Sequence, residues 1–65
     1  MYRIKITDRK TGLIRIRSPV EARDYIKNKY PGLYPDPDGI IKAILDGATI
    51  VAHHDIFMRV TAPKD

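Results

Sequence analysis

Cysteine and tryptophan are both absent from the 65-residue sequence. The lack of cysteine excludes disulfide bonds, thiolate zinc sites and thiol redox chemistry. Two histidines cannot complete a tetrahedral zinc site by themselves, so we expect no metal and no other cofactor. A chain of this size buries only about 60% of its unfolded surface. Its stability must therefore come from strong local signals or from self-association.

Long apolar runs are also missing. No stretch approaches the roughly 18 residues that cross a membrane. The N-terminal segment MYRIKITDRK alternates apolar and polar residues, whereas a signal peptide would have an apolar centre. We expect a cytoplasmic protein without membrane contact, associated with the nucleoid if it binds DNA.

Acidic residues are scarce in the N-terminal segment. Residues 1–17 hold six cations and one acid, Asp8, for a net charge of +5. Residues 18–65 hold six cations and seven acids, for a net charge of −1. Positive charge concentrated in one segment indicates a polyanionic partner.

Two alternating runs, YRIKIT and LIRIR, flank the turn-rich segment DRKTG and predict a β-hairpin over residues 1–17. With a loop of about five residues, one face would carry the isoleucines Ile4, Ile6, Ile14 and Ile16, with Tyr2 at its edge. The opposite face would gather the cations Arg3, Lys5, Arg15 and Arg17. Like charges across a strand pair are unfavourable unless an anion relieves them.

Two helices are expected in residues 18–47. Ser18, Pro19 and Glu21 form a capping-box start for a helix over about 19–30, whose apolar stripe is Val20, Ala22, Tyr25 and Ile26. Asp36 and Pro37 begin a second helix over about 37–46, which ends before Gly47. Its apolar face is Ile40, Ile41, Ile44 and Leu45.

The segments ATIVA and IFMRVT predict two strands around the turn HHD, and residues 62–65 form a tail. The whole chain is then a single α+β domain of order ββααββ. It comprises a basic hairpin (1–17), two helices (18–47), a second hairpin or wing (48–61) and the tail. Both helices must cover the apolar faces of the strands.

Several short motifs resemble those of known DNA-binding modules. Ser18, Glu21 and Ala22, followed by a helix ending at a glycine and a hairpin, resemble excisionase-like winged helix-turn-helix proteins. Asp8, Thr11 and Gly12 ahead of that helix, and Ile41, Leu45 and Gly47 after it, resemble the helix-turn-helix module of intron-encoded homing endonucleases. The resemblance implies a winged-helix-like fold and a phage or mobile-element regulator of transcription or recombination. It would expose Asp38, Lys42 and Ala43 on the second helix and place His53 and His54 at the wing tip.

The leading hypothesis is a small protein that binds duplex DNA through its basic hairpin. A two-stranded ribbon fits the major groove, and arginine pairs with phosphates or guanine edges. Lys29 is a further candidate for a phosphate contact. The expected nucleic-acid contacts are Arg3, Lys5, Arg9, Lys10, Arg15, Arg17, Lys27 and Lys42.

The basic hairpin could also be an ordinary solvated sheet face. Two alternative functions stay open as well. The protein could be a protein-binding module or an inhibitor of a host nucleic-acid enzyme, anchored by Tyr30, Leu33 and Tyr34 of the connector. It could also be a homodimer that pairs through a strand edge. We expect no enzyme, because the adjacent His53 and His54 lack further metal ligands and Asp55 with His54 lacks a serine nucleophile other than the capping Ser18.

Overall fold

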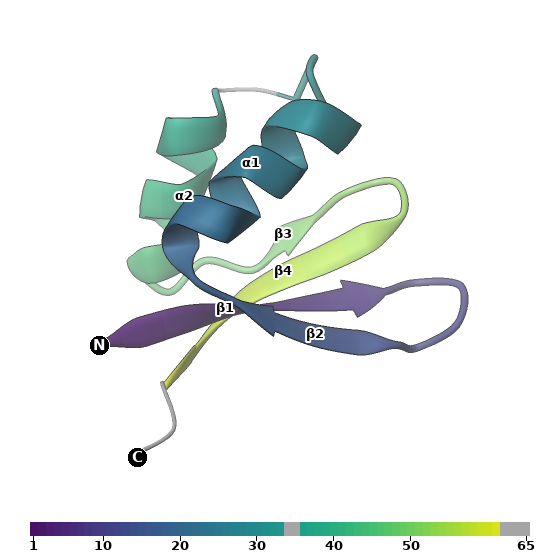
Figure 1. Ribbon diagram of the computed structural model, residues 1–65, viewed down its shortest axis with the longest axis horizontal. Helices are drawn as coiled ribbons and strands as arrows, with labels where there is room; N and C mark the ends of the chain where they lie inside the picture. The colour runs from purple at the N-terminus through teal and green to yellow at the C-terminus, as the bar shows by residue number, and fades with distance from the viewer. Residues whose placement is uncertain (34–35, 62–65) are drawn as a thin grey trace.

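The computed structural model describes residues 1–33 and 36–61, and these form an α+β domain of order ββααββ, as expected. The elements are β1 (Tyr2–Asp8), β2 (Ile14–Arg17), α1 (Pro19–Lys29), α2 (Pro37–Leu45), β3 (Ile50–Val51) and β4 (Asp55–Thr61). The four strands make one antiparallel sheet in the order β2-β1-β4-β3. The N-terminal and C-terminal strands thus pair at its centre (Figure 1).

Local capping fixes both helix starts where the sequence predicts them. The Ser18 hydroxyl accepts the Glu21 N–H and the Glu21 carboxylate accepts the Ser18 N–H, which completes the capping box. The Asp36 carboxylate accepts the Gly39 N–H at 2.7 Å at the start of α2. Each helix ends one residue earlier than predicted.

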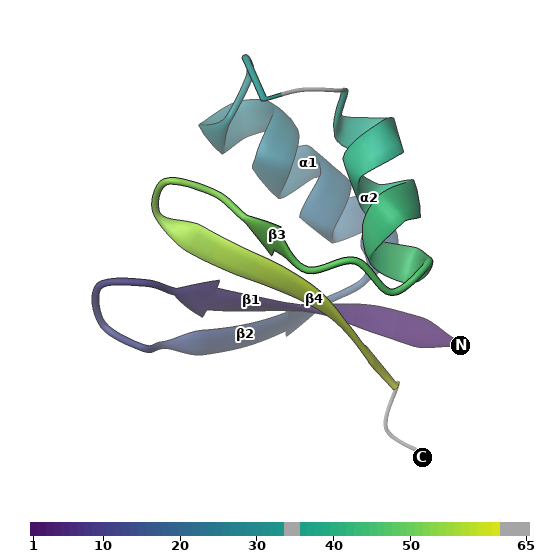
Figure 2. The ribbon, with the colours of Figure 1, turned by 180° about the vertical axis from the view of Figure 1, so that it is seen from behind.

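Both helices cover the same face of the sheet (Figures 1 and 2). The core between the two layers consists of Ile4, Ile6, Ala22, Ile26, Ile40, Ile41, Ile44, Ala52 and Phe57. Tyr25 and Tyr30 pack edge-on against the ring of Phe57. Val20 was expected on this apolar stripe, but it is 60% exposed because it projects away from the sheet.

The register of the first hairpin corrects the predicted distribution of its side chains. Ile4 pairs with Arg17 and Ile6 pairs with Arg15, whereas Lys5 pairs with Ile16. Directly opposed residues share a face, so the two β2 arginines lie on the helix side and Ile14 and Ile16 lie on the other side. The reason is the loop: β1 extends through Asp8, whose N–H donates to the Leu13 carbonyl, so only residues 9–12 lie between this hydrogen-bonded pair. A register change of one residue reverses the face of every side chain.

Arg3, Lys5, Arg15 and Arg17 therefore do not gather on one face. Arg3 and Lys5 lie on the side of the sheet away from the helices. Arg15 and Arg17 lie on the helix side, at the β2 edge of the sheet. The prediction of a uniformly basic ribbon face is wrong. Any surface that binds a polyanion must be built from other combinations of these residues.

Candidate nucleic-acid interface

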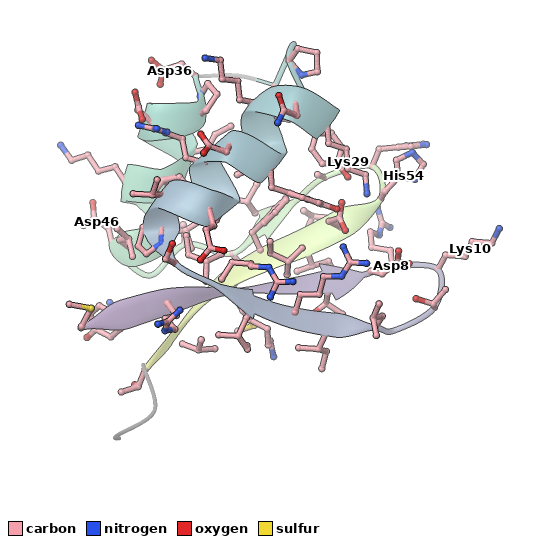
Figure 3. The ribbon with its side chains drawn as sticks, viewed as in Figure 1. Asp8, Lys10, Lys29, Asp36, Asp46 and His54 are labelled. Carbon is pink, nitrogen blue, oxygen red and sulfur yellow. The ribbon has the colours of Figure 1, made fainter. Side chains whose placement is uncertain are left out.

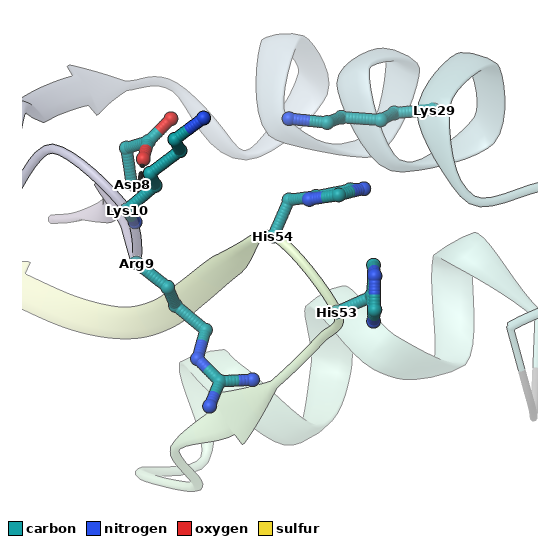
Figure 4. A pocket seen from close by; sticks show the side chains of 6 residues that line it. All are labelled: Asp8, Arg9, Lys10, Lys29, His53 and His54. Atoms are coloured by element: carbon teal, nitrogen blue, oxygen red, sulfur yellow. Dashed lines mark hydrogen bonds between the residues drawn. The ribbon is translucent and has the colours of Figure 1, made fainter.

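One end of the sheet brings cations together from three elements. The β1–β2 loop, the β3–β4 turn and the C-terminal end of α1 surround an open depression lined by Asp8, Arg9, Lys10, Lys29, His53 and His54 (Figure 4). A smaller hollow beside it is lined by Arg15 together with Asp8, Lys29 and Asp55. We call the cations Arg9, Lys10, Arg15 and Lys29, with the two histidines, the tip cluster.

The shape of the β1–β2 loop follows from its polar residues. The Asp8 carboxylate accepts the backbone N–H groups of Lys10 at 2.8 Å and Thr11 at 2.9 Å. These two hydrogen bonds, the Thr11 bond first, hold the pKa of Asp8 below its usual value. Gly12 closes the loop with a φ of +78°, a conformation that glycine adopts without strain. The Asp8, Thr11 and Gly12 motif thus has a structural role, and it presents Arg9 and Lys10 at the end of the hairpin.

Hydrogen bonds tie this loop to the β3–β4 turn. The Arg9 N–H donates to the His54 carbonyl at 2.9 Å, and the Arg9 guanidinium donates to the Ala52 carbonyl at 3.1 Å. The His54 N–H donates in turn to the Tyr30 hydroxyl at 3.0 Å. The rings of His53 and His54 contact each other edge-on. Both histidines thus lie in the turn, as predicted, next to the cations of the first hairpin.

A buried carboxylate holds Lys29 at this end of the molecule. Asp55 is 2% exposed, and it accepts hydrogen bonds from Tyr30 at 2.6 Å and Tyr25 at 3.0 Å. Lys29 Nζ lies 2.9 Å from the same carboxylate and donates to the Tyr25 hydroxyl at 2.8 Å. We call Asp55, Tyr25, Lys29 and Tyr30 the Asp55 network. It joins α1, together with the C-cap residue Tyr30, to β4.

The Asp55 network shifts three pKa values. Burial alone would raise the pKa of Asp55, but the hydrogen bonds from Tyr30, Lys29 and Tyr25 outweigh it and lower that pKa. The hydrogen bonds of Lys29 to Tyr25 and Asp55 raise the pKa of the ammonium. Burial, and then the hydrogen bond to Asp55, raises the pKa of Tyr30 to about 12. Asp55 is therefore ionised, Lys29 charged and Tyr30 neutral at physiological pH.

The tip cluster keeps an excess of positive charge. Its four cations face two acids, Asp8 and Asp55, so a net charge of +2 remains with both histidines counted as neutral. Within the described part of the chain, the side chains of Lys10 and Arg15 make no hydrogen bond or ion pair, and both residues are exposed. An anionic group bound at this end of the sheet would find these donors unoccupied.

The remaining predicted nucleic-acid contacts lie elsewhere. Arg3 and Lys5 are on the sheet face away from the helices, and Arg17 is at the opposite end of β2 from the tip. Lys27 lines a separate depression with Arg23, Asp36 and Asp38. Lys42 is exposed on α2, whose flanking residues Asp36 and Asp46 lie on the other side of the molecule from Lys10, Lys29 and His54 (Figure 3).

The predicted protein-binding connector is only partly described. Tyr30 and Leu33 pack against the core, and the Tyr30 hydroxyl is engaged by Asp55 and His54. Tyr30 is thus a partly buried support of the tip cluster rather than an exposed anchor. Tyr34 and the predicted tail at 62–65 lie outside the described residues.

Sequence reasoning underestimated Lys29 and missed the Asp55 network. Tyr25 and Lys29 are separated by four residues on one helix, a spacing that places side chains in contact and could have indicated their pairing. Nothing local indicated that Asp55 would lie beneath them, because β4 reaches that position only through sheet pairing with β1. The Asp55 carboxylate contacts tyrosines and lysine rather than the His54 imidazole with which the sequence paired it.

The described residues contain no group of three or more histidine and acidic side chains placed to hold a metal ion. Neither of their helices is long and apolar enough to cross a membrane.

Comparison with known proteins identifies no relative. No protein-family model matches the sequence, and neither a curated protein nor a solved structure is detectably similar to it. The resemblance to excisionase-like proteins and homing-endonuclease modules therefore stays a prediction based on the motifs quoted above.

Proposed function

We propose that this protein binds duplex DNA, with the phosphate backbone entering the depression at the tip cluster. The observation that carries the proposal is the meeting of Arg9, Lys10, Arg15 and Lys29 from three elements at one end of the sheet, around an open depression and the smaller hollow beside it. Phosphate contacts supply most of the affinity in sequence-independent DNA binding. The exposed, unoccupied donors of Lys10 and Arg15 suit that role, and arginine can donate two hydrogen bonds to one phosphate.

Lys29 and the hydrogen-bonded loops would give this surface its rigidity. Asp55 and Tyr25 occupy two of the three protons of the Lys29 ammonium, which leaves one for an anion. Arg9 is fixed by the Ala52 carbonyl. Cations that are already ordered lose less conformational entropy on binding, so they contribute more affinity per contact.

The test is titration of random-sequence duplex DNA, followed by fluorescence anisotropy at about 50 and 200 mM salt. Four phosphate contacts give a slope of log affinity against log salt of about −3.6. The double variant K10A/R15A removes two of them, so its slope should fall to about −1.8 and its affinity at about 50 mM salt should fall by about two orders of magnitude. Circular dichroism would verify that the variant is folded.

The double variant K27A/K42A is the matched control, because it removes the same charge from exposed positions outside the tip cluster. It should keep most of the affinity and the salt slope of the wild-type protein. Equal losses in both double variants would show that only net charge matters and would contradict the assigned surface. Absence of binding at low salt would contradict the function itself.

A further inference from the structure

The sheet face opposite the helices carries an ordered pattern of side chains. Strand alternation and register place nine residues there, which we call the open face: Arg3, Lys5, Thr7, Ile14, Ile16, Val51, Ile56, Met58 and Val60. No described segment covers this face, since both helices lie on the other side of the sheet (Figures 1 and 2). Val51 is 60% exposed, Ile14 54% and Ile16 39%.

The polar and apolar residues of the open face form three parallel stripes. The central stripe runs along β1 and consists of Arg3, Lys5 and Thr7. The apolar stripe on β2 consists of Ile14 and Ile16, and the one on β4 and β3 consists of Ile56, Met58, Val60 and Val51. None of these nine positions is acidic. An occupant of this face must therefore be anionic along its centre and apolar on both sides.

We infer that the open face is a docking surface for an amphipathic helix of a partner protein, with acidic residues along the centre of its contact surface. Two residues of β1 span about 6.7 Å, which separates Arg3 from Lys5. Acidic residues four apart on a helix are about 6 Å apart along its axis. A helix lying along β1 could thus place one carboxylate against each cation.

The width of the pattern also fits a single helix. The strands on either side of β1 are each about 4.8 Å away, so the two apolar stripes are about 10 Å apart. This is about the diameter of a helix with its side chains. Leucines flanking the acidic line would contact Ile16 on one side and Met58 on the other, the two direct neighbours of Lys5. Desolvation by these apolar contacts would strengthen the central ion pairs.

Other occupants match this pattern less well. A second copy docked face to face about a twofold axis would bring the cations of one β1 against those of the other. An anionic membrane would require the flanking isoleucines to insert while the central cations stay at the headgroups. Nucleic acid would place phosphates against apolar stripes, and the nine residues include no aromatic ring on which a base could stack.

The test uses two fluorescein-labelled, alanine-based helical peptides as probes. One has glutamates at positions i and i+4 flanked by leucines, and the other has lysines in place of the glutamates. Anisotropy titration of the wild-type protein should show at least about tenfold tighter binding of the glutamate peptide. The charge reversal R3E/K5E should invert this preference, which a merely destabilised protein would not do.

Two further variants localise the site. Ile16→Thr should weaken binding of the glutamate peptide at least fivefold. Val20→Thr, which changes a more exposed aliphatic residue on α1, should not. K10A/R15A should leave peptide binding unchanged. This inference is therefore tested separately from the proposed DNA binding, which that variant should weaken.

Several results would overturn the inference. These are equal affinity for both peptides, no binding of either, or an unchanged preference in R3E/K5E. Co-sedimentation with phosphatidylserine vesicles that R3E/K5E abolishes would assign the face to a membrane surface instead. A dimer in sedimentation equilibrium that Ile16→Thr dissociates, and the glutamate peptide does not, would assign the face to a second copy.

Discussion

Asp55 is the residue on which the interior and the tip cluster both depend. Its carboxylate is buried, and two tyrosine hydroxyls and one ammonium satisfy it. Removing one member of a buried ion pair destabilises a protein by about 3–5 kcal/mol. The partial exposure of Lys29, 35% for its side chain, places the expected effect at the lower end of that range.

Asp55→Asn should therefore lower the free energy of unfolding by about 3 kcal/mol, because the amide leaves Lys29 unpaired and turns a donor toward the tyrosines. Tyr30→Phe, which removes one hydrogen bond to the carboxylate, should lower it by about 2 kcal/mol. Urea unfolding followed by circular dichroism measures both. Asp46→Asn, an exposed acid after α2, serves as the control and should change stability by less than about 0.5 kcal/mol. Equal effects at positions 46 and 55 would contradict the role given to the network.

At the scale of the elements, the loops between helices and strands determine how each element is oriented and which side chains it exposes. Gly47 follows α2 with a φ of +110°, and it turns the chain from the helix toward β3. Gly32, in the α1–α2 connector, has no positive φ, and a Cβ atom there would meet no atom within 4 Å. The two glycines thus offer the same substitution in two different backbone conformations.

Gly47→Ala should destabilise the protein by about 1 kcal/mol, because an L residue at that φ is strained although space is available. Gly32→Ala should instead stabilise it by about 0.5 kcal/mol through a less flexible unfolded chain. Thermal or urea unfolding of the two variants side by side is the measurement. A neutral Gly47→Ala would show that the α2–β3 connection relaxes to another conformation.

The length of the β1–β2 loop likewise determines on which face of the sheet each β2 side chain lies. A loop one residue longer, with Asp8 outside β1, would have placed all four isoleucines of the hairpin on one face. The observed loop instead turns Ile14 and Ile16 to the open face and moves Arg15 beside Lys29. One residue of register thus creates both the tip cluster and the apolar stripe of β2.

At the scale of the whole molecule, the Asp55 network links the two layers and makes their association sensitive to pH. The folded-state pKa of Asp55 lies below the usual 3.8, so its stabilisation is present above that value and is lost as the pH falls through the folded pKa. The pKa of Tyr30 rises from 10.0 to about 12, so its contribution is present below pH 10 and is lost as the pH rises through about 12. Lys29, whose pKa is also raised, acts in the same alkaline direction.

The free energy of unfolding contributed by these groups should therefore be constant between about pH 4 and 10 and should decrease outside that range. Urea unfolding at pH values from about 3 to 11.5 would measure the profile. Tyr30→Phe should reduce the alkaline decrease to the part that Lys29 contributes. It should also reduce the acidic decrease, because Asp55 loses a hydrogen bond that lowers its pKa. A wild-type protein whose stability rises below pH 4 would show that Asp55 is not held ionised in the folded state.

The two proposed surfaces contain five of the six cations of residues 1–17, all except Arg17. Arg9, Lys10 and Arg15 belong to the tip cluster, and Arg3 and Lys5 belong to the open face. The sequence shows this charge as one block, whereas alternation along the strands separates it in space. A DNA contact and a protein contact could therefore be made at the same time from different sides of one small domain.

The order of the elements and the starts of both helices are predictable from the sequence alone, because they depend on neighbours in the chain. Ser18 with Glu21, Asp36 with Pro37, and the positive-φ glycines Gly12 and Gly47 act within a few residues of their own positions. The register of β2, the burial of Asp55 and the proximity of Lys29 to the hairpin loop follow instead from tertiary contacts. These depend on hydrogen bonds between segments distant in sequence, and a loop shortened by a single residue is enough to exchange the two faces of a strand.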